Sequence, residues 1–530
     1  MIKNLKIVES LNYRIILLFF ILITILIRFP FFFYPFYGDA ATFILMGQST
    51  LDGNLLYDSH ASIKPPLLYW FFSLLIFLSF KSFFLLHLYA SIIIGSSTFL
   101  IFSLLNKITN IQKAIFISLI YPFYVSFYVS GGDILMSEHI VLVPLLFSLI
   151  IYAKKDQSTL DLLIIGILLG ISSMIRSNII LPAILITFST LLFNSHFSLK
   201  KKIFDIFLIS TGGLLVLIFC LLPFLYTDSL DLFLKWVVIA PLKFANSDSG
   251  TSGMSRVHIF YTLILKGTYI INFTFDEYFK NLKIIPTSIF WILSSLSFLI
   301  LSSKIINKKV RANNILLIKL MVYISGISLS IILTNKYHNH YLIQIVPFFL
   351  ILIGFMCVDK IDILKVRVIR ISILTIFFFS IIVNLIIYTN TNYSLKSTPE
   401  YLISNFLKNK LAKDDKVFML DGHIIYWLIN RFPITSGIHP GDIFKKELLK
   451  LHNDDKYTPT DEFKKIFEQN PKYLIFSKKN DFRWFVNRIE SNDDKLLLKY
   501  FNKYKKIKSY NGDKNKIYLR TKSYDIYEKF

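Results

Sequence analysis

Long apolar runs alternate with short polar segments over residues 1–390. A helix of roughly 17 to 25 apolar residues is long enough to cross a hydrocarbon core of about 30 Å. The pattern therefore predicts an α-helical polytopic membrane protein with about 11 transmembrane helices, several of them at the short end of this range. The predicted spans cover residues 15–34, 82–105, 114–130, 140–153, 161–175, 179–193, 203–226, 284–303, 314–334, 341–357 and 371–389.

Lysine and arginine are concentrated in every second gap between these spans. Residues 200–202 and 304–311 are examples, whereas the gaps on the other side hold few basic residues. Because cytoplasmic loops carry the excess of positive charge, the N-terminus is predicted to be cytoplasmic. With an odd number of spans, the segment after the last span lies outside.

Two apolar segments are excluded from the predicted spans. Leu67–Phe80 would make a helix of roughly 21 Å, and counting it as a span would place the lysine clusters outside. We expect it to be an outer juxtamembrane or re-entrant segment. Leu230–Phe244 is expected to lie in the membrane interface. The first run, residues 15–34, has no small-residue cleavage site and is interpreted as an uncleaved helix.

The chain changes character after about residue 390. Residues 391–530 are rich in Lys, Asp and Asn, and contain strand-like runs at Lys416–Leu420 and Tyr473–Phe476. This segment is long enough to form its own core. We predict a soluble α/β domain on the outer side, joined to a membrane domain of residues 1–390.

Charge and cysteine content exclude several function classes. The formal net charge is +24, but residues 1–390 contain no soluble basic domain, so nucleic acid is not an expected partner. The lysines instead indicate topology and contact with anionic lipid head groups. Cys220 and Cys357 lie in different apolar runs, which disfavours a disulfide framework and gives redox chemistry no support.

Five ionisable residues lie in or beside the short loops predicted to face outward. They are Asp39, Lys64, Glu138, Arg176 and His340. Isolated charges close to membrane spans are uncommon without a function, and several on one side suggest a shared site.

The two acids have two interpretations each. Partial burial at the mouth of the first span would raise the pKa of Asp39 and suit it to general-base catalysis. Asp39 is equally consistent with a cap of the following helix, and Glu138 with an acid in the cap region of its span. Asp52 and Asp58 flank a turn and are best interpreted as solvated turn acids.

The basic residues suit phosphate binding. Pro65 and Pro66 fix the backbone after Lys64, which favours a rigidly held cation over a lysine that extends to the interface. Arg176 presents a planar fork that matches phosphate oxygens. His338 and His340 have no third ligand nearby in sequence, so a zinc site is disfavoured. Donation to a phosphate or a sugar hydroxyl is favoured over membership of an interfacial aromatic belt.

The outer loops resemble the bacterial branch of the GT-C superfamily, which includes relatives of protein O-mannosyltransferases and aminoarabinose (lipid A) transferases. The similar features are Asp39 after the first span, the turn from Gly53 to Asp58, and the run Lys64-Pro-Pro-Leu-Leu-Tyr-Trp70. Further matches follow in the same order along the chain. These are Ser137-Glu138, Arg176 and the His340-Tyr341-x-x-Gln344-x-x-Pro347 pattern.

The resemblance implies an inverting glycosyltransferase that needs no metal or other cofactor. Asp39 would deprotonate an acceptor hydroxyl, which would attack the anomeric carbon of a sugar on a polyprenyl phosphate. Lys64, Arg176 and His340 would balance charge on the leaving lipid phosphate. Four more residues are expected to contact substrate: Tyr57, Tyr69, Tyr341 and Gln344. The location implied is the bacterial cytoplasmic (inner) membrane, and the acceptor a lipopolysaccharide or lipid A sugar, another envelope glycan or a protein hydroxyl.

One departure from the family leaves the catalytic acids open. Many relatives carry Glu directly after the first-loop Asp, whereas this chain has Ala40. Either Asp39 acts alone or Glu138 supplies a second catalytic acid. Two other function classes also remain: a ligase or polymerase that uses a lipid pyrophosphate, and a flippase for lipid-linked glycans. Transport is disfavoured because the spans carry almost no charge near their centres.

Overall fold

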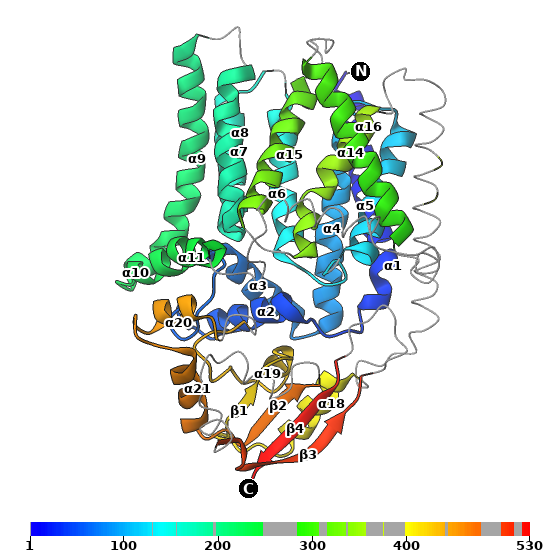
Figure 1. Cartoon of the computed structure of the whole chain (residues 1–530). Coiled ribbons are helices and arrows are strands. Elements are labelled where there is room, and N and C mark those ends of the chain that lie inside the picture. Colours follow the sequence, from blue (N-terminus) through cyan, green and yellow to red (C-terminus); the bar gives the residue numbers. More distant parts are fainter. Residues whose placement is uncertain are drawn as a thin grey trace. The chain divides into compact units, whose positions relative to one another are not determined.

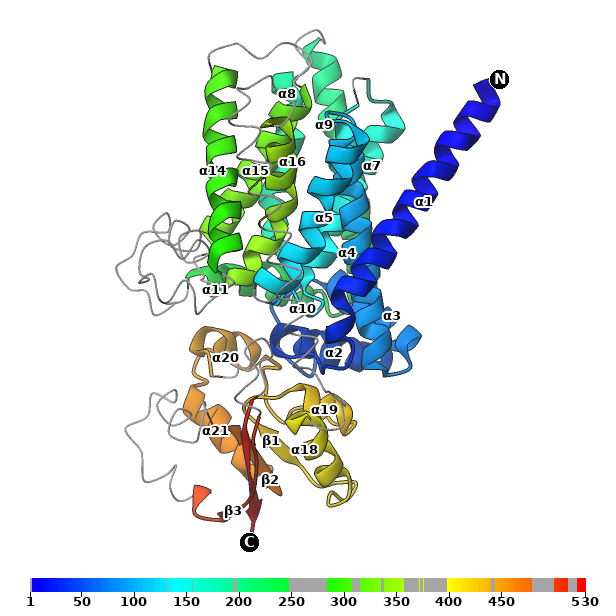
Figure 2. The same cartoon turned by 90° about the vertical axis from the view of Figure 1, so that its right-hand side faces the viewer.

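The computed structural model is mostly helical, with one β-sheet near the C-terminus (Figures 1 and 2). Among the residues that the structure describes, six helices are long and apolar enough to cross a membrane, and five shorter apolar helices accompany them. The protein is thus a multi-pass membrane protein. The structure describes residues 2–129, 131–154, 156–193, 198–246, 284–306, 315–334, 338–356, 371, 375, 398–439, 444–478, 500–512 and 522–530.

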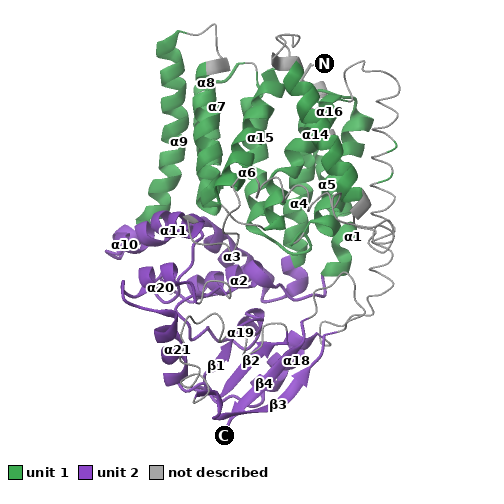
Figure 3. Ribbon diagram, viewed as in Figure 1, with its two compact units in different colours: residues 1–31, 87–222, 248–388 green, residues 32–86, 223–247, 389–530 purple. Residues whose placement is uncertain are grey.

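The chain forms two compact units, coloured separately in Figure 3. Unit 1 comprises residues 1–31, 87–222 and 248–388, and unit 2 comprises residues 32–86, 223–247 and 389–530. Unit 2 therefore combines the predicted first outer loop and residues 223–247 with the C-terminal segment. Each unit is described by itself.

Unit 1 is built from apolar helices. The helices wholly or mainly within it are α1 (Ile2–Arg28), η1 (Phe29–Phe31), α4 (Phe83–Leu105), α5 (Ile111–Tyr128), α6 (Ser137–Tyr152), α7 (Thr159–Ile175), η2 (Ser177–Ile179), α8 (Ile180–Phe193), α9 (Leu199–Tyr226), α14 (Ile284–Ile306), α15 (Ile315–Leu333), η5 (Asn339–Gln344) and α16 (Val346–Met356). Glycine permits close backbone contact between α7 and α9. A Cβ atom on Gly166 would lie 2.0 Å from the carbonyl oxygen of Ile209, so a larger side chain would push these two helices apart.

In unit 2, α2 (Gly38–Leu51) and α3 (Pro66–Ser79) pack side by side. The Phe43 and Tyr69 rings are 6.4 Å apart, and Ser73 Oγ donates to the carbonyl of Gly47 at 2.7 Å. A step from Phe43 to Gly47 along α2 thus matches a step from Tyr69 to Ser73 along α3. The two helices therefore run in the same direction. Continued by one turn, this register places Asp39 level with Pro65. Asp39 and Lys64 therefore belong to the same end of the helix pair.

The C-terminal segment of unit 2 contains a four-stranded mixed sheet in the order β1-β2-β4-β3. β1 (Val417–Met419) pairs in parallel with β2 (Tyr473–Ser477), whereas β4 (Tyr524–Lys529) is antiparallel to β2 and to β3 (Tyr504–Tyr510). All side chains of β1 and β2 are buried. This burial requires cover on both faces of the sheet.

Helices provide that cover. Phe463 and Phe467 of α21 (Pro459–Glu468) pack on one face against Phe418 and Phe476. On the other face, Tyr426 of α19 (Ile424–Leu428) hydrogen-bonds the backbone of β1. α18 (Pro399–Lys408) lies on the same side as α19 in Figure 2. The remaining helices of unit 2 are α10 (Leu230–Phe233), the π-helix η3 (Leu234–Ile239), α11 (Ala240–Asn246) and α20 (Lys446–His452).

These elements confirm the predicted fold class and both predicted strands. Every predicted span before residue 357 coincides with a helix, while residues 371–389 lie almost wholly outside the described residues. The segment Leu67–Phe80 forms α3, which is 14 residues long. The segment Leu230–Phe244 is helical throughout, with a π-helix at its centre.

Candidate functional site

Glu138 and Arg176 form a buried ion pair in unit 1. Glu138 lies in the first turn of α6, and Arg176 ends α7 as its C-cap. Arg176 Nη1 contacts Glu138 Oε1 and donates to Ser137 Oγ at 2.9 Å, while Ser137 Oγ donates to Glu138 Oε2 at 2.9 Å. The side chain of Arg176 is 4% exposed and that of Glu138 is 0% exposed. α6 and α7 pack closely, so the start of one helix meets the end of the other.

His340 and Tyr341 complete this cluster. His340 Nε2 lies 3.6 Å from Glu138 Oε1, and the Arg176 guanidinium stacks 4.6 Å above the Tyr341 ring. Both residues belong to η5. The structure thus brings together four of the predicted site residues of unit 1, in segments up to two hundred residues apart in the chain. A cation over an aromatic face adds attraction that survives burial.

Gln344 lies behind the cluster. Its Oε1 accepts a hydrogen bond of 3.5 Å from Asn178, whose amide also donates to Ser330 at 3.2 Å. Gln344 is completely buried. These contacts join η5 to η2 and α15, so the amide network fixes the helical turn that carries His340 and Tyr341.

Arg28, to which the sequence analysis assigned no role, supports the loop in front of Glu138. It is completely buried and donates to Ser126 Oγ at 3.0 Å and to the carbonyls of Gly132 and Asp133. Buried arginines are uncommon unless paired. The sequence contained one signal for this residue, an arginine at the end of an otherwise uncharged apolar run.

In unit 2, Asp39 contacts a histidine from the far end of the chain. Asp39 lies in the first turn of α2, whose N-cap is Tyr37. Asp39 Oδ1 is 3.0 Å from His439 Nε2, and the two side chains are 26% and 31% exposed. Asp39 is therefore not the N-cap residue itself, although its charge is favourable near the helix N-terminus. His439 was not among the predicted site residues.

Lys64 directly precedes the helix that its prolines begin. Pro65 is the N-cap of α3 and Pro66 its first residue. The Tyr57 hydroxyl donates to the carbonyl of Lys64 at 2.6 Å, and the Tyr69 hydroxyl bonds Ser62 Oγ. Both tyrosines are buried. These bonds hold the Lys64 carbonyl and the Ser62 side chain against buried rings, which restrains the backbone at Lys64.

The loop before Lys64 pairs with a C-terminal segment. Ala61 and Gly437 form a parallel β-bridge, in which Ala61 N–H donates to Ser436 O at 2.7 Å and Ile438 N–H to Ala61 O at 3.3 Å. The His60 ring lies 2.9 Å from the carbonyl of Pro433. Burial lowers the pKa of His60, an effect that this hydrogen bond opposes.

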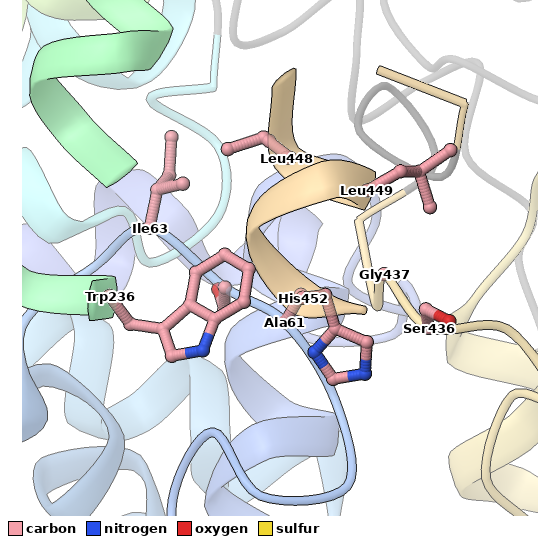
Figure 4. Close-up of a pocket in the computed structure, with 9 residues that line it drawn as sticks. Ala61, Ile63, Trp236, Ser436, Gly437, Leu448, Leu449 and His452 are labelled. Carbon is pink, nitrogen blue, oxygen red and sulfur yellow. The ribbon is translucent and has the colours of Figure 1, made fainter. Parts of the chain in front are cut away.

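A small hollow lies beside this bridge (Figure 4). It measures about 260 Å³ including the part open to solvent, and Ser62, Ser436 and Gly437 contribute to its lining. Trp236 and His452 face each other there with ring centroids 5.9 Å apart. Burial lowers the pKa of His452 to about 4, so this ring is neutral at neutral pH.

The candidate sites contain no recognisable metal centre. Within the described ranges, no three His, Cys, Asp or Glu side chains are grouped so that they could hold a metal ion.

No protein-family model matches the sequence, and no curated protein sequence does. Solved structures do match. The oligosaccharyltransferase AglB from Archaeoglobus fulgidus, in complex with an inhibitory peptide and a dolichol-phosphate, aligns with a TM-score of 0.54 and 11% identity over 95% of this chain and 73% of that one. ArnT from Cupriavidus metallidurans, bound to undecaprenyl phosphate, aligns with a TM-score of 0.57 and 11% identity over 96% and 97% of the two chains.

This chain has the GT-C fold. ArnT in its apo state gives a TM-score of 0.58 at 8% identity, again over 96% of this chain and 97% of that one. The GT-C fold and the resemblance to aminoarabinose transferases were both expected from the outer-loop motifs. At this level of identity the likeness concerns architecture, and the chemistry must be argued from the side chains.

Proposed function

We propose that this protein is an inverting glycosyltransferase that moves a sugar from a polyprenyl phosphate to a hydroxyl of a cell-envelope acceptor at the outer face of the bacterial cytoplasmic membrane. One observation carries the proposal. Asp39 and Lys64 belong to the same end of the parallel pair α2 and α3. A carboxylate and a cation at one end of a helix pair suit a reaction in which a hydroxyl loses a proton while a phosphate leaves.

The reaction assigned to these residues balances in charge and protons. Asp39 takes the proton of the acceptor hydroxyl as its oxygen bonds to the anomeric carbon. The bond from that carbon to the phosphate oxygen breaks, and its electron pair stays on the oxygen. The lipid phosphate gains one negative charge in this step, and Lys64 provides the compensating cation. The N-termini of α2 and α3 favour negative charge at the same place.

In unit 1, Arg176 is assigned to phosphate binding, for which its planar guanidinium is suited. Arg176 Nη1 is bound to Glu138 and Ser137, whereas its Nε–H has no hydrogen-bond partner among the described residues. Glu138 is fully buried and ion-paired with Arg176, a geometry that suits a residue that orients a guanidinium better than a base that must meet an acceptor. We therefore assign proton abstraction to Asp39 and the aiming of Arg176 to Glu138.

Purified protein in lipid nanodiscs, given a panel of polyprenyl-phosphate sugars and envelope acceptors, tests the proposal. We expect acceptor-dependent release of polyprenyl phosphate that Asp39→Asn abolishes. Asp58→Asn is the matched control, because Asp58 lies exposed in the same outer loop. Release of lipid pyrophosphate would identify a ligase or polymerase. Movement of the intact lipid-linked glycan across the membrane without turnover would identify a flippase.

A further inference from the structure

The contact between Asp39 and His439 links the start of the chain to its C-terminal segment. The two atoms, Asp39 Oδ1 and His439 Nε2, are at hydrogen-bond distance, 3.0 Å. Both side chains are only partly exposed. A carboxylate accepts from an imidazole N–H with the added strength of a charge-assisted hydrogen bond. The interaction does not need His439 to be protonated, since a neutral ring with hydrogen on Nε2 also donates to that oxygen.

The loop that carries His439 is held firmly in place. The β-bridge between Ala61 and Gly437 lies two residues before His439. Ser436, next to that bridge, bonds to the buried carboxylate of Glu462 through its backbone N–H at 2.6 Å and through its hydroxyl at 2.8 Å. Lys465 Nζ donates to the same serine hydroxyl at 2.7 Å. Ser436 is thus held by α21, and the next residue, Gly437, is held by the loop that contains Ala61.

A second contact fixes α2 against the same segment. Trp427 Nε1 of α19 donates to Gln48 Oε1 of α2 at 3.2 Å. Together with the β-bridge, this contact constrains both partners of the Asp39–His439 pair in two places. The histidine is therefore held near the carboxylate by the fold and not by their mutual attraction alone.

We propose that His439 is a positioning residue for Asp39: its Nε2–H aims the carboxylate and keeps it ready to accept the acceptor proton. The inference rests on the proposed function and adds that residues 389–530 complete the transferase site. The C-terminal segment then has a part in the chemical step, in addition to any contact with the acceptor. The proton taken by Asp39 during transfer leaves to solvent after the lipid phosphate departs.

Two substitutions of His439 separate hydrogen-bond donation from bulk. His439→Leu removes the donor, whereas His439→Gln keeps an N–H at a similar distance from the backbone. We expect His439→Leu to lower kcat about tenfold to hundredfold, the range for a lost hydrogen bond to a charged group, with KM for donor and acceptor nearly unchanged. His439→Gln should retain kcat within about threefold. Normal kcat in His439→Leu, or equal losses in both variants, would overturn the assignment.

A crosslink tests the geometry without turnover. β-bridge partners lie within the separation that a disulfide spans, so Ala61→Cys with Gly437→Cys should form a disulfide once Cys220 and Cys357 are replaced by Ser. Ala61→Cys with Lys508→Cys, an exposed position on the edge strand β3, is the control pair. Failure of the first pair to crosslink would overturn the inference even if the enzyme is active. If the first cysteine pair crosslinks but the wild-type protein releases no lipid phosphate, the proposed function is contradicted, and the role of His439 with it.

Discussion

Replacement of Glu138 tests whether Glu138 and Arg176 stabilise the fold as a buried ion pair whose two charges cancel. Glu138→Gln keeps the shape of the side chain but removes its charge, and leaves the Arg176 guanidinium buried without its counter-ion. Both side chains are almost completely inaccessible. Loss of one partner from a buried pair costs about 3–5 kcal/mol of stability, because the remaining charge stays desolvated.

Arg176 keeps its other contacts in this variant. Its hydrogen bond to Ser137 and its position over the Tyr341 ring remain. The cation–π contact contributes about 0.5–2 kcal/mol, and it is also present in the wild type, so it does not cancel the loss. We therefore expect the midpoint of thermal unfolding of Glu138→Gln to fall by several degrees.

A double variant gives the matched comparison. Glu138→Gln with Arg176→Met removes both charges and keeps similar volume, and such replacements of whole buried pairs are often neutral for stability. Unfolding of the purified proteins in detergent, followed by tryptophan fluorescence and circular dichroism, measures both variants. The double variant should unfold near the wild-type temperature but lose transferase activity. If Glu138→Gln alone unfolds at the same temperature as the wild type, the pair is not buried as described.

Three further predictions concern other parts of the molecule. Lys64→Ala should lower kcat/KM for the lipid-linked donor about tenfold or more, because Lys64 balances the charge that the phosphate gains, while Lys64→Arg retains most activity. Lys81→Ala, at an exposed lysine beyond the end of α3, should leave kcat/KM unchanged in the release assay. Arg28→Met should destabilise the protein by about 2–5 kcal/mol, because it leaves two carbonyls and a serine hydroxyl without their donor; a melting temperature equal to that of the wild type would count against this assignment. Burial lowers the pKa of His423 to about 3. Below about pH 6.5 the unfolded chain therefore binds a proton at this residue that the folded chain does not bind. The stability contributed by residues 398–530 should then fall as the pH drops from 7 to 5, by at most about 2 kcal/mol, and His423→Phe should weaken this dependence in denaturant titrations at the two pH values.

The hydrophobic pattern predicted the helices because each span requires an uninterrupted apolar run of a length set by the membrane. The sequence also predicted β1 and β2, because both of their faces are covered and all their residues except Ser477 are apolar. The sequence did not predict which type of helix the short elements form. The π-helix η3 within Leu230–Phe244 depends on local packing that no simple periodicity records.

The candidate site could be predicted only where loop topology brings residues together. Glu138 and Arg176 lie at adjoining ends of α6 and α7, so alternation of the helices already placed both on one side of the membrane. His439 is separated from Asp39 by 400 positions. It does not lie next to a predicted span, so helix topology could not place it. Its placement depends on the Ala61–Gly437 bridge, a contact between two irregular loops without a sequence signature. Arg28 carried a signal as an isolated charge, but its partners are backbone carbonyls, which a sequence does not identify.

The most direct test of the central claim measures both products of a single turnover. Labelled polyprenyl-phosphate sugar, limiting relative to enzyme in nanodiscs, is mixed with acceptor, and the released lipid phosphate, the transferred sugar and its anomeric configuration are determined by chromatography and NMR. The proposed chemistry predicts one lipid phosphate per sugar transferred, inverted configuration, no turnover in Asp39→Asn and full turnover in Asp58→Asn. Retained configuration, or unchanged turnover in Asp39→Asn, would contradict it.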